Sequence, residues 1–179
     1  MWTIAGTLTP VPVLDRLDLV ADPVAAALRS LVDAPRLAVA EIDPALADTA
    51  AFCAAYGSPL DGSANCVVVA GKRGDLTRYA ACLVLATTRA DVNGLVRRRL
   101  DARKASFAPM DDAVALTGME YGGITPVGLP EDWPVLVDAA VAAAPAVVIG
   151  SGVRHSKLAL PGALAARLPG AEVVDGLGR

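Results

Sequence analysis

The hydrophobic pattern consists of short apolar runs, each bounded by glycine, proline or aspartate. Continuous runs rich in Val, Ile and Leu indicate buried strands, whereas apolar positions that follow an Asp-Pro pair indicate helices. Strands are expected over residues 37–42, 66–70, 79–87, 134–137, 146–149, 158–160 and 172–174. Helices are expected over residues 24–32, from Asp43-Pro44 to Tyr56 with Gly57 as the cap, after Asp91, over 109–118 and after Pro161.

The order of these elements indicates the fold class. Residues 66–88 contain two β-rich runs on either side of a Gly-Lys-Arg-Gly turn, which predicts a hairpin. A doubly wound fold requires regular β-α-β alternation, and the expected elements do not alternate in this way. The sequence therefore predicts an α+β fold with a mixed sheet. Because no internal repeat or linker interrupts it, residues 1–179 are expected to form a single domain.

Composition and charge narrow the function classes. The chain is 54% hydrophobic but only 4% aromatic, so its core consists mainly of Ala, Val and Leu. A net charge of −3 argues against a protein that coats DNA or RNA along its whole surface. The single histidine, His155, excludes a multi-histidine metal site, and the cysteines form no Cys-x-x-Cys pair. No metal and no cofactor are therefore expected.

The cysteines and the longest apolar stretch indicate the cellular compartment of the protein. The odd number of cysteines and an N-terminus without a basic segment before an apolar one favour a reducing compartment. The longest apolar stretch, residues 135–150, contains Asp138 and Pro145 and is shorter than the ~20 residues that a membrane span needs. We therefore expect a cytoplasmic protein without a membrane partner.

Two local features are weak candidates for function. The turn Gly150-Ser151-Gly152 follows an expected strand, but it lacks the third glycine of a dinucleotide loop, which favours a simple tight turn. His155 lacks the orienting group and the oxyanion hole of a Ser-His site, which favours a structural role. A basic cluster, either a solvated helix face or a local phosphate contact, consists of Arg97, Arg98, Arg99, Arg103 and Lys104.

The loop 121–130 is the most informative segment. It holds three glycines and two prolines, which are too many for a helix or a central strand. Gly122 and Gly123 let a ligand approach the backbone closely and let N–H groups point at an oxyanion. A purely structural turn is the alternative, but a loop stiffened by Pro126 and Pro130 is typical of a functional site.

The segment Tyr121-Gly122-Gly123-Ile124-Thr125-Pro126-Val127-Gly128, preceded by Thr117-Gly118, resembles the signature loop of the YbaK/EbsC family and of the related insertion domain of bacterial prolyl-tRNA synthetases. The strand that ends in Asp138, the strand-turn-strand of residues 146–160 and Gly57-Ser58-Pro59 resemble other segments of that family in the same order. The resemblance covers about residues 24–176. It implies an α+β domain in which helices surround a mixed, barrel-like sheet.

The resemblance also implies an activity, namely hydrolysis of the ester that joins a wrong amino acid to the 3′ end of a tRNA. In the family the Gly-x-x-x-Pro loop, here Gly122 to Pro126, lines the pocket, and its N–H groups stabilise the oxyanion. The 2′-hydroxyl of the tRNA helps to activate the water, so no protein nucleophile is required. The implied partner is the 3′ end of an aminoacyl-tRNA, alone or with a synthetase, and expected contacts beyond the pocket are Arg97, Arg98, Arg103 and Lys104.

Two positions depart from the family pattern. The lysine that opens the first hairpin strand in the family is replaced by Asn65. An acidic residue usually faces that lysine from the strand after the Gly150 turn, and Lys157 occupies this position here. One hypothesis is a swap, in which Lys157 enters the pocket and replaces the lost ammonium. The alternative is that Lys157 points to solvent.

The resemblance assigns roles to individual residues. Catalytic roles fall to Gly122 and Gly123 as backbone donors and to Asn65 and Lys157 as contacts to the ester or the terminal ribose. The expected substrate-binding residues are Ile124, Thr125, Pro126, Asp138, Gly150, Ser151 and Gly152, with a local cap as an equal alternative for Asp138. The leading prediction is a trans-editing deacylase. The alternative is a non-catalytic binding module that recognises a tRNA end, a nucleotide or a small aminoacyl compound.

Overall fold

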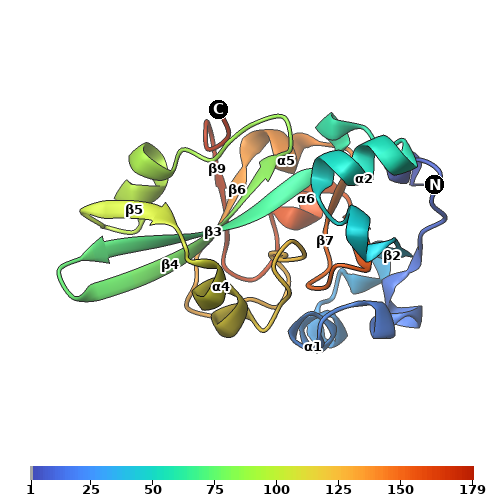
Figure 1. Ribbon diagram of the computed structural model, residues 1–179, viewed down its shortest axis with the longest axis horizontal. Coiled ribbons are helices and arrows are strands. Elements are labelled where there is room, and N and C mark those ends of the chain that lie inside the picture. Colours follow the sequence, from blue (N-terminus) through green and yellow to red (C-terminus); the bar gives the residue numbers. More distant parts are fainter. Residues whose placement is uncertain (1) are drawn as a thin grey trace.

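The computed structural model describes residues 2–179, which form two β-sheets with helices around them (Figure 1). The larger sheet contains, in spatial order, β5 (Lys104–Phe107), β3 (Ala64–Arg73), β4 (Leu76–Leu85), β6 (Val135–Asp138) and β9 (Ala171–Val174). β3 is antiparallel to β4 and β5, whereas β6 is parallel to β4 and β9. The larger sheet is therefore mixed, as the sequence predicted.

The smaller sheet contains, in spatial order, β1 (Val11–Pro12), β2 (Ala38–Glu41), β8 (Ser156–Leu160) and β7 (Val147–Gly150). All its pairings are antiparallel. A parallel bridge between Ser63 and Val148 connects β7 to the residue before β3. The expectation of one barrel-like sheet is wrong, because the two sheets stay open. The short edge strand β1 ends in Pro12, which has no N–H with which to pair a further strand.

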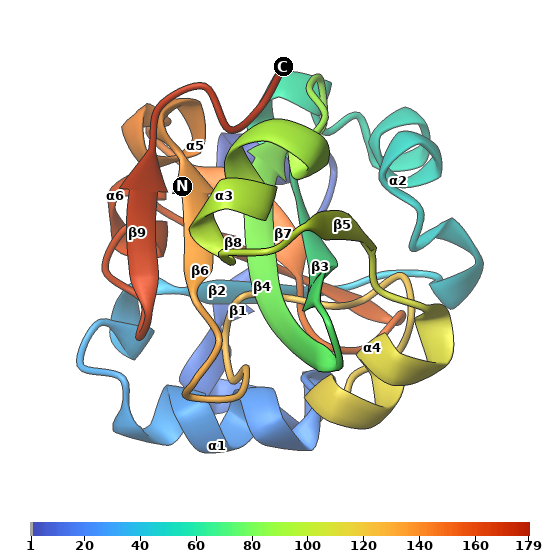
Figure 2. The same cartoon turned by 90° about the vertical axis from the view of Figure 1, so that its left-hand side faces the viewer.

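The helices lie on several sides of the sheets. They are α1 (Asp22–Ser30), α2 (Thr49–Tyr56), α3 (Arg97–Arg99), α4 (Met110–Thr117), α5 (Ala139–Ala143) and α6 (Gly162–Ala165), with a π-helix over Val92–Val96. In Figure 2, α5 and α6 lie beside β9, α2 lies on the opposite flank, and α1 lies across the lower end. Within residues 2–179, no helix is long and apolar enough to cross a membrane.

Local signals explain most helix ends. Asp91 accepts hydrogen bonds from the N–H groups of Gly94 and Leu95 and so begins the expected helix. Gly57 and Gly118 end α2 and α4 in the left-handed conformation, with φ of 70° and 66°. The helix expected from Asp43-Pro44 is wrong at its start, because Asp43 caps only a 3-10 turn over Pro44–Leu46.

A second capping residue separates that turn from α2. Asp48 accepts hydrogen bonds from the N–H groups of Ala50 and Ala51, so α2 begins at Thr49. Ala47 and Asp48 therefore lie between the 3-10 turn and α2, where the Ala47 carbonyl is available to a partner outside the two helices.

The main core lies between the sheets and α1. Leu28, Leu83, Ile149, Leu158 and Leu160 are fully buried there, and they come from α1, β4, β7 and β8. Burial of one such side chain contributes roughly 1.5–3 kcal/mol. This packing holds β7 and β8 in place, and the polar residues discussed below are attached to these two strands.

Candidate functional site

A cavity of about 560 Å³ opens where the two sheets meet. Its lining comes from the first half of β3, the end of β7, the first turn of α2 and the loop after α4. The predicted site residues found on this lining are Asn65, Gly122, Ile124, Gly150 and Lys157. The fold therefore brings together positions that are widely separated in the sequence.

Lys157 enters the cavity from β8 and is only 8% exposed. Its ammonium donates a 2.7 Å hydrogen bond to the carbonyl of Ala47 and lies 5.4 Å from the centroid of the Phe52 ring. Burial lowers the pKa of Lys157 from its usual 10.5 to about 8, and Asp48 opposes that change. At neutral pH the side chain therefore carries a positive charge inside the cavity.

Asn65 lies on the same cavity lining, near the start of β3. Its Oδ1 accepts a 2.6 Å hydrogen bond from the hydroxyl of Thr49. Within residues 2–179, no acceptor lies within hydrogen-bond distance of its Nδ2 group. The side chains of Asn65 and Lys157 are thus both held by the segment 47–49, and the two N–H groups of the Asn65 amide can still donate hydrogen bonds.

The glycine loop contributes Gly122 and Ile124 to the lining. Gly122 has a φ of 87°, and a Cβ there would collide with the guanidinium of Arg154. In the described part of the chain, the backbone N–H groups of Gly122 and Ile124 have no hydrogen-bond acceptor. Gly123 differs from the expectation of a free donor, because its N–H donates to the carbonyl of Glu120 at 2.9 Å.

Close backbone contact explains two further glycines. A Cβ on Gly123 would lie 2.7 Å from the carbonyl carbon of Val153, and one on Gly150 would lie 2.6 Å from the carbonyl oxygen of Ile124. The carbonyl of Gly123 also accepts a 2.7 Å hydrogen bond from the N–H of Gly152. These glycines press the loop against the end of β7, which is a packing role.

Arg154 is a site residue that the sequence analysis missed. Its Nη1 donates to the carbonyl of Tyr121 at 3.3 Å, and its Nη2 donates to the carbonyl of Pro44 at 3.0 Å. Its backbone N–H donates to the Glu120 carboxylate at 2.6 Å. Arg154 thereby connects the glycine loop to the segment before α2. No motif marks it, because its partners lie far away in the sequence.

Five of the expected substrate-binding residues lie away from the lining. Thr125 and Pro126 are buried residues of the loop, and the Thr125 hydroxyl has no hydrogen-bond partner within residues 2–179. Asp138 caps α5 by accepting from the Ala140 N–H at 2.9 Å, and its other oxygen accepts from the Gly178 N–H at 2.7 Å. Asp138 is therefore a structural cap, the second of the two roles considered for it.

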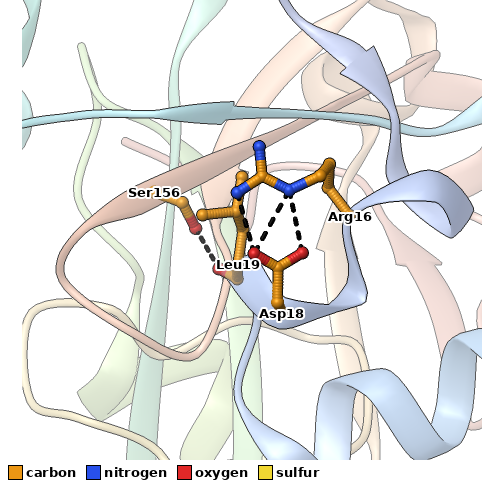
Figure 3. Close-up of polar contacts among 4 residues, drawn as sticks. All are labelled: Arg16, Asp18, Leu19 and Ser156. Atoms are coloured by element: carbon orange, nitrogen blue, oxygen red, sulfur yellow. Dashed lines mark hydrogen bonds and ion pairs between the residues drawn. The ribbon is translucent and has the colours of Figure 1, made fainter.

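Ser151 and Gly152 also serve the packing of the turn. The Ser151 hydroxyl donates to the carbonyl of Ser156 at 3.0 Å, and the Ser156 hydroxyl contacts the Leu19 carbonyl. Figure 3 shows this last contact beside the ion pair of Arg16 and Asp18. Since Ser151 is fully buried and bonded to backbone, it holds the turn before Lys157 in place.

The basic cluster lies on α3, on the segment that follows it and at the start of β5, next to the β3–β4 hairpin (Figure 2). Arg97 donates to the carbonyl of Asn93 at 2.8 Å, and Arg99 pairs with Glu172. Arg98, Arg103 and Lys104 are exposed and form no ion pair within residues 2–179. They do not line the cavity, but β5 leads from Lys104 to Phe107, which does.

The cavity offers no activated thiol. Cys66 lies on the lining, and burial raises the pKa of its thiol well above the usual range. Burial likewise raises the pKa of Cys82 to about 12. Both therefore stay protonated at neutral pH, and a thiol is a poor nucleophile. Among the described residues, no group of three His, Cys, Asp or Glu side chains is arranged to hold a metal ion.

The fold agrees with what the chain is similar to. A solved structure of a proposed trans-editing enzyme for prolyl-tRNA synthetase superposes with a TM-score of 0.72 at 24% identity, covering 86% of this chain and 93% of that one. A scaffold used for epitope backbone grafting by computational design superposes with a TM-score of 0.73 at 24% identity, covering 87% and 95%. A hypothetical protein superposes with a TM-score of 0.69 at 19% identity, covering 79% and 90%.

Sequence comparison assigns the family. No curated protein matches the chain. The model of the aminoacyl-tRNA editing domain matches residues 43–168, which include the cavity lining from Ala47 to Lys157. The chain therefore belongs to the aminoacyl-tRNA editing domain family.

Proposed function

We propose that this chain is an aminoacyl-tRNA deacylase that edits in trans, hydrolysing the ester between a wrong amino acid and the 3′ end of its tRNA. The observation that carries the proposal is the buried Lys157 ammonium in the same cavity as the Gly122 loop. Membership of the editing domain family supports it. Such a function belongs in the cytoplasm, where charged tRNAs are used.

The proposed reaction needs few protein groups. A water attacks the ester carbonyl, assisted by the 2′-hydroxyl of the terminal ribose. The N–H groups of Gly122 and Ile124 and the ammonium of Lys157 stabilise the oxyanion that forms. The bond from the carbonyl carbon to the ribose oxygen then breaks, the ribose oxygen takes a proton, and the amino acid leaves. This route uses neither a thiol nor His155.

The swap of Lys157 for the family lysine is part of this proposal. Lys157 supplies the positive charge that Asn65 lacks, and the Asn65 amide donates a hydrogen bond to the ester or the terminal ribose. The common attachment of both side chains to residues 47–49 supports the exchange, because it places them beside one segment of the lining. An apolar residue at position 157 would remove the charge without filling the cavity.

Deacylation of a panel of mischarged tRNAs tests the proposal. Wild type is expected to hydrolyse at least one of them, and Lys157→Met is expected to lose that activity. Adding Asn65→Lys to Lys157→Met returns an ammonium to the family position and is expected to recover part of the activity. No recovery, with both variants folded, would argue against the swap.

A second candidate is a binding module with the same cavity. The observation that favours it is Asn65 at the position where the family carries its lysine. This candidate predicts no turnover across the panel together with retained binding of an uncharged tRNA end. A bulky replacement at Gly122 distinguishes the two candidates. In a deacylase it is expected to abolish hydrolysis of mischarged tRNA, whereas in a binding module it is expected only to weaken the affinity for the tRNA end.

A further inference from the structure

Two exposed aromatic side chains mark the mouth of the cavity. Phe107 is 60% exposed and Tyr121 is 57% exposed, and both belong to the cavity lining. The other aromatic residues pack within the protein or are partly covered, as in the pairs Phe52–Tyr56 and Tyr79–Trp133 and at Trp2. In a chain with only 4% aromatic residues, the exposed rings thus occur at one place.

The two rings reach the cavity from different segments. Phe107 ends the edge strand β5, and Tyr121 stands directly before Gly122 in the glycine loop. Neither ring belongs to a hydrophobic core cluster. Packing of the core therefore does not explain why these two aromatic residues are there. Exposed aromatic rings at the edge of a binding cavity are the usual platform for stacking unpaired bases.

A basic track leads from these rings along β5. Lys72 and Lys104 face each other in the β3–β5 register, and the N–H of Arg103 donates to the carbonyl of Lys72. Like charges directly opposite each other destabilise a sheet unless something neutralises them. Within residues 2–179, none of these three side chains has an acidic partner, whereas nearby Arg73 pairs with Asp101.

The track has a length that suits a nucleic-acid strand. Phe107 lies three positions after Lys104, about 10 Å along the extended edge strand β5, and the two side chains point to opposite faces of that strand. A phosphate at Lys104 and a base at Phe107 therefore require a short stretch of RNA that crosses the free edge of β5. Charge and stacking together favour a single-stranded RNA end, because it carries both phosphates for the lysines and unpaired bases for the rings.

We propose that Phe107 and Tyr121 form a nucleobase subsite that stacks the terminal adenine of the tRNA, while the preceding phosphates follow β5 toward Lys104 and Lys72. This inference rests on the proposed function. A base stacked at the subsite would place the terminal ribose, and the ester attached to it, at the cavity. The subsite adds a binding element that the glycine loop does not supply. The amino-acid composition does not indicate this subsite, because the subsite depends on where the fold places the two rings.

The test uses an uncharged RNA stem-loop with a single-stranded CCA 3′ end, and the same RNA with an abasic terminal residue. Wild type is expected to bind the first RNA about tenfold more tightly than the second. Phe107→Ala and Tyr121→Ala are expected to lose most of this preference without weakening binding to the abasic RNA. Tyr121→Phe and Phe107→Trp keep a ring and are expected to keep the preference.

Two controls sharpen the result. Leu76→Ala removes a similarly exposed apolar side chain at the hairpin turn, away from the lining, and is expected to change neither affinity. Lys104→Ala is expected to weaken both RNAs equally and to reduce the salt dependence of binding. Thermal unfolding of each variant verifies that it is folded.

Three outcomes would overturn the subsite. They are equal binding of the two RNAs by wild type, equal weakening of both RNAs in the alanine variants, and unchanged binding of both RNAs in the alanine variants. Because the RNA is uncharged, none of these readouts depends on turnover. If wild type prefers the RNA with the terminal base but deacylates no mischarged tRNA, the subsite is supported and the proposed function is refuted.

Discussion

The ammonium of Lys157 donates a 2.7 Å hydrogen bond to the carbonyl oxygen of Ala47, inside the cavity. Ala47 precedes the Asp48 cap, so the break between the 3-10 turn and α2 supplies the acceptor. Lys157 is only 8% exposed, and the Phe52 ring lies 5.4 Å from its ammonium. One hydrogen bond does not offset the loss of water, and the pKa of Lys157 is lowered for that reason.

The first prediction concerns stability and pH. The pKa of Lys157 falls from 10.5 to about 8 on folding, so between these values the unfolded chain binds the proton more strongly. Stability from this residue therefore rises as pH rises through that window, by up to about 3 kcal/mol. The buried thiols act in the opposite direction, because the pKa values of Cys66 and Cys82 are raised on folding.

A comparison with Lys157→Met isolates the lysine from the thiols. Denaturant unfolding of both proteins at pH 7 and at pH 10.5 is expected to show wild type gaining stability relative to the variant. If the difference in unfolding free energy between wild type and Lys157→Met is the same at both pH values, the pKa of Lys157 is not lowered in the folded protein.

The second prediction concerns Gly122. Gly122→Ala places a Cβ at a φ of 87° and against the Arg154 guanidinium, so the arginine contact to the loop, or the loop itself, must shift. The matched control is Gly176→Ala, where φ is 69° and no atom lies within 4 Å. Both variants are expected to lose about 1 kcal/mol from left-handed strain. Only Gly122→Ala is expected to slow deacylation, by about tenfold or more, because displaced donors no longer meet the oxyanion. Equal rates for the two variants would contradict this role.

The third prediction concerns Arg154 as a positioning residue. Arg154→Ala removes the two hydrogen bonds that connect Tyr121 to Pro44 and is expected to lower kcat. Arg154 also lowers the pKa of Lys157 through charge repulsion, so its removal raises that pKa. The fall in activity at alkaline pH should then move to higher pH in Arg154→Ala but not in Arg154→Lys, which keeps the charge. A pH profile unchanged in Arg154→Ala would reduce Arg154 to a purely structural role.

The fourth prediction concerns Asp138. Its two oxygens accept hydrogen bonds from the N–H groups of Ala140 and Gly178, so Asp138→Ala removes a helix cap and frees the C-terminal segment. The expected loss is about 1–2 kcal/mol of unfolding free energy, measured by chemical denaturation. Deacylation by the folded variant is expected to match wild type, since Asp138 does not line the cavity. A selective loss of activity would return Asp138 to the substrate-binding group.

The features that the sequence predicts correctly depend on interactions between residues close together in the chain. Gly57, Gly118 and Asp91 act on residues within one helical turn, and the structure confirms all three. The β3–β4 hairpin was equally readable, because both strands are apolar and a short turn joins them. The strand β5 was missed because it is an exposed edge strand, without the alternation of buried and exposed residues that reveals a strand.

The sequence by itself determined the α+β class, the irregular glycine loop and the family motif, because each depends on neighbouring residues. Only the tertiary structure decided which side chains meet. Asp138 is a cap because Gly178 returns to it, and Lys157 enters the cavity because β8 pairs with β7 there. Arg154, Phe107 and Tyr121 acquire their positions in the same way. Contacts between residues distant in the chain follow from how the two sheets pack, and no local pattern records that packing.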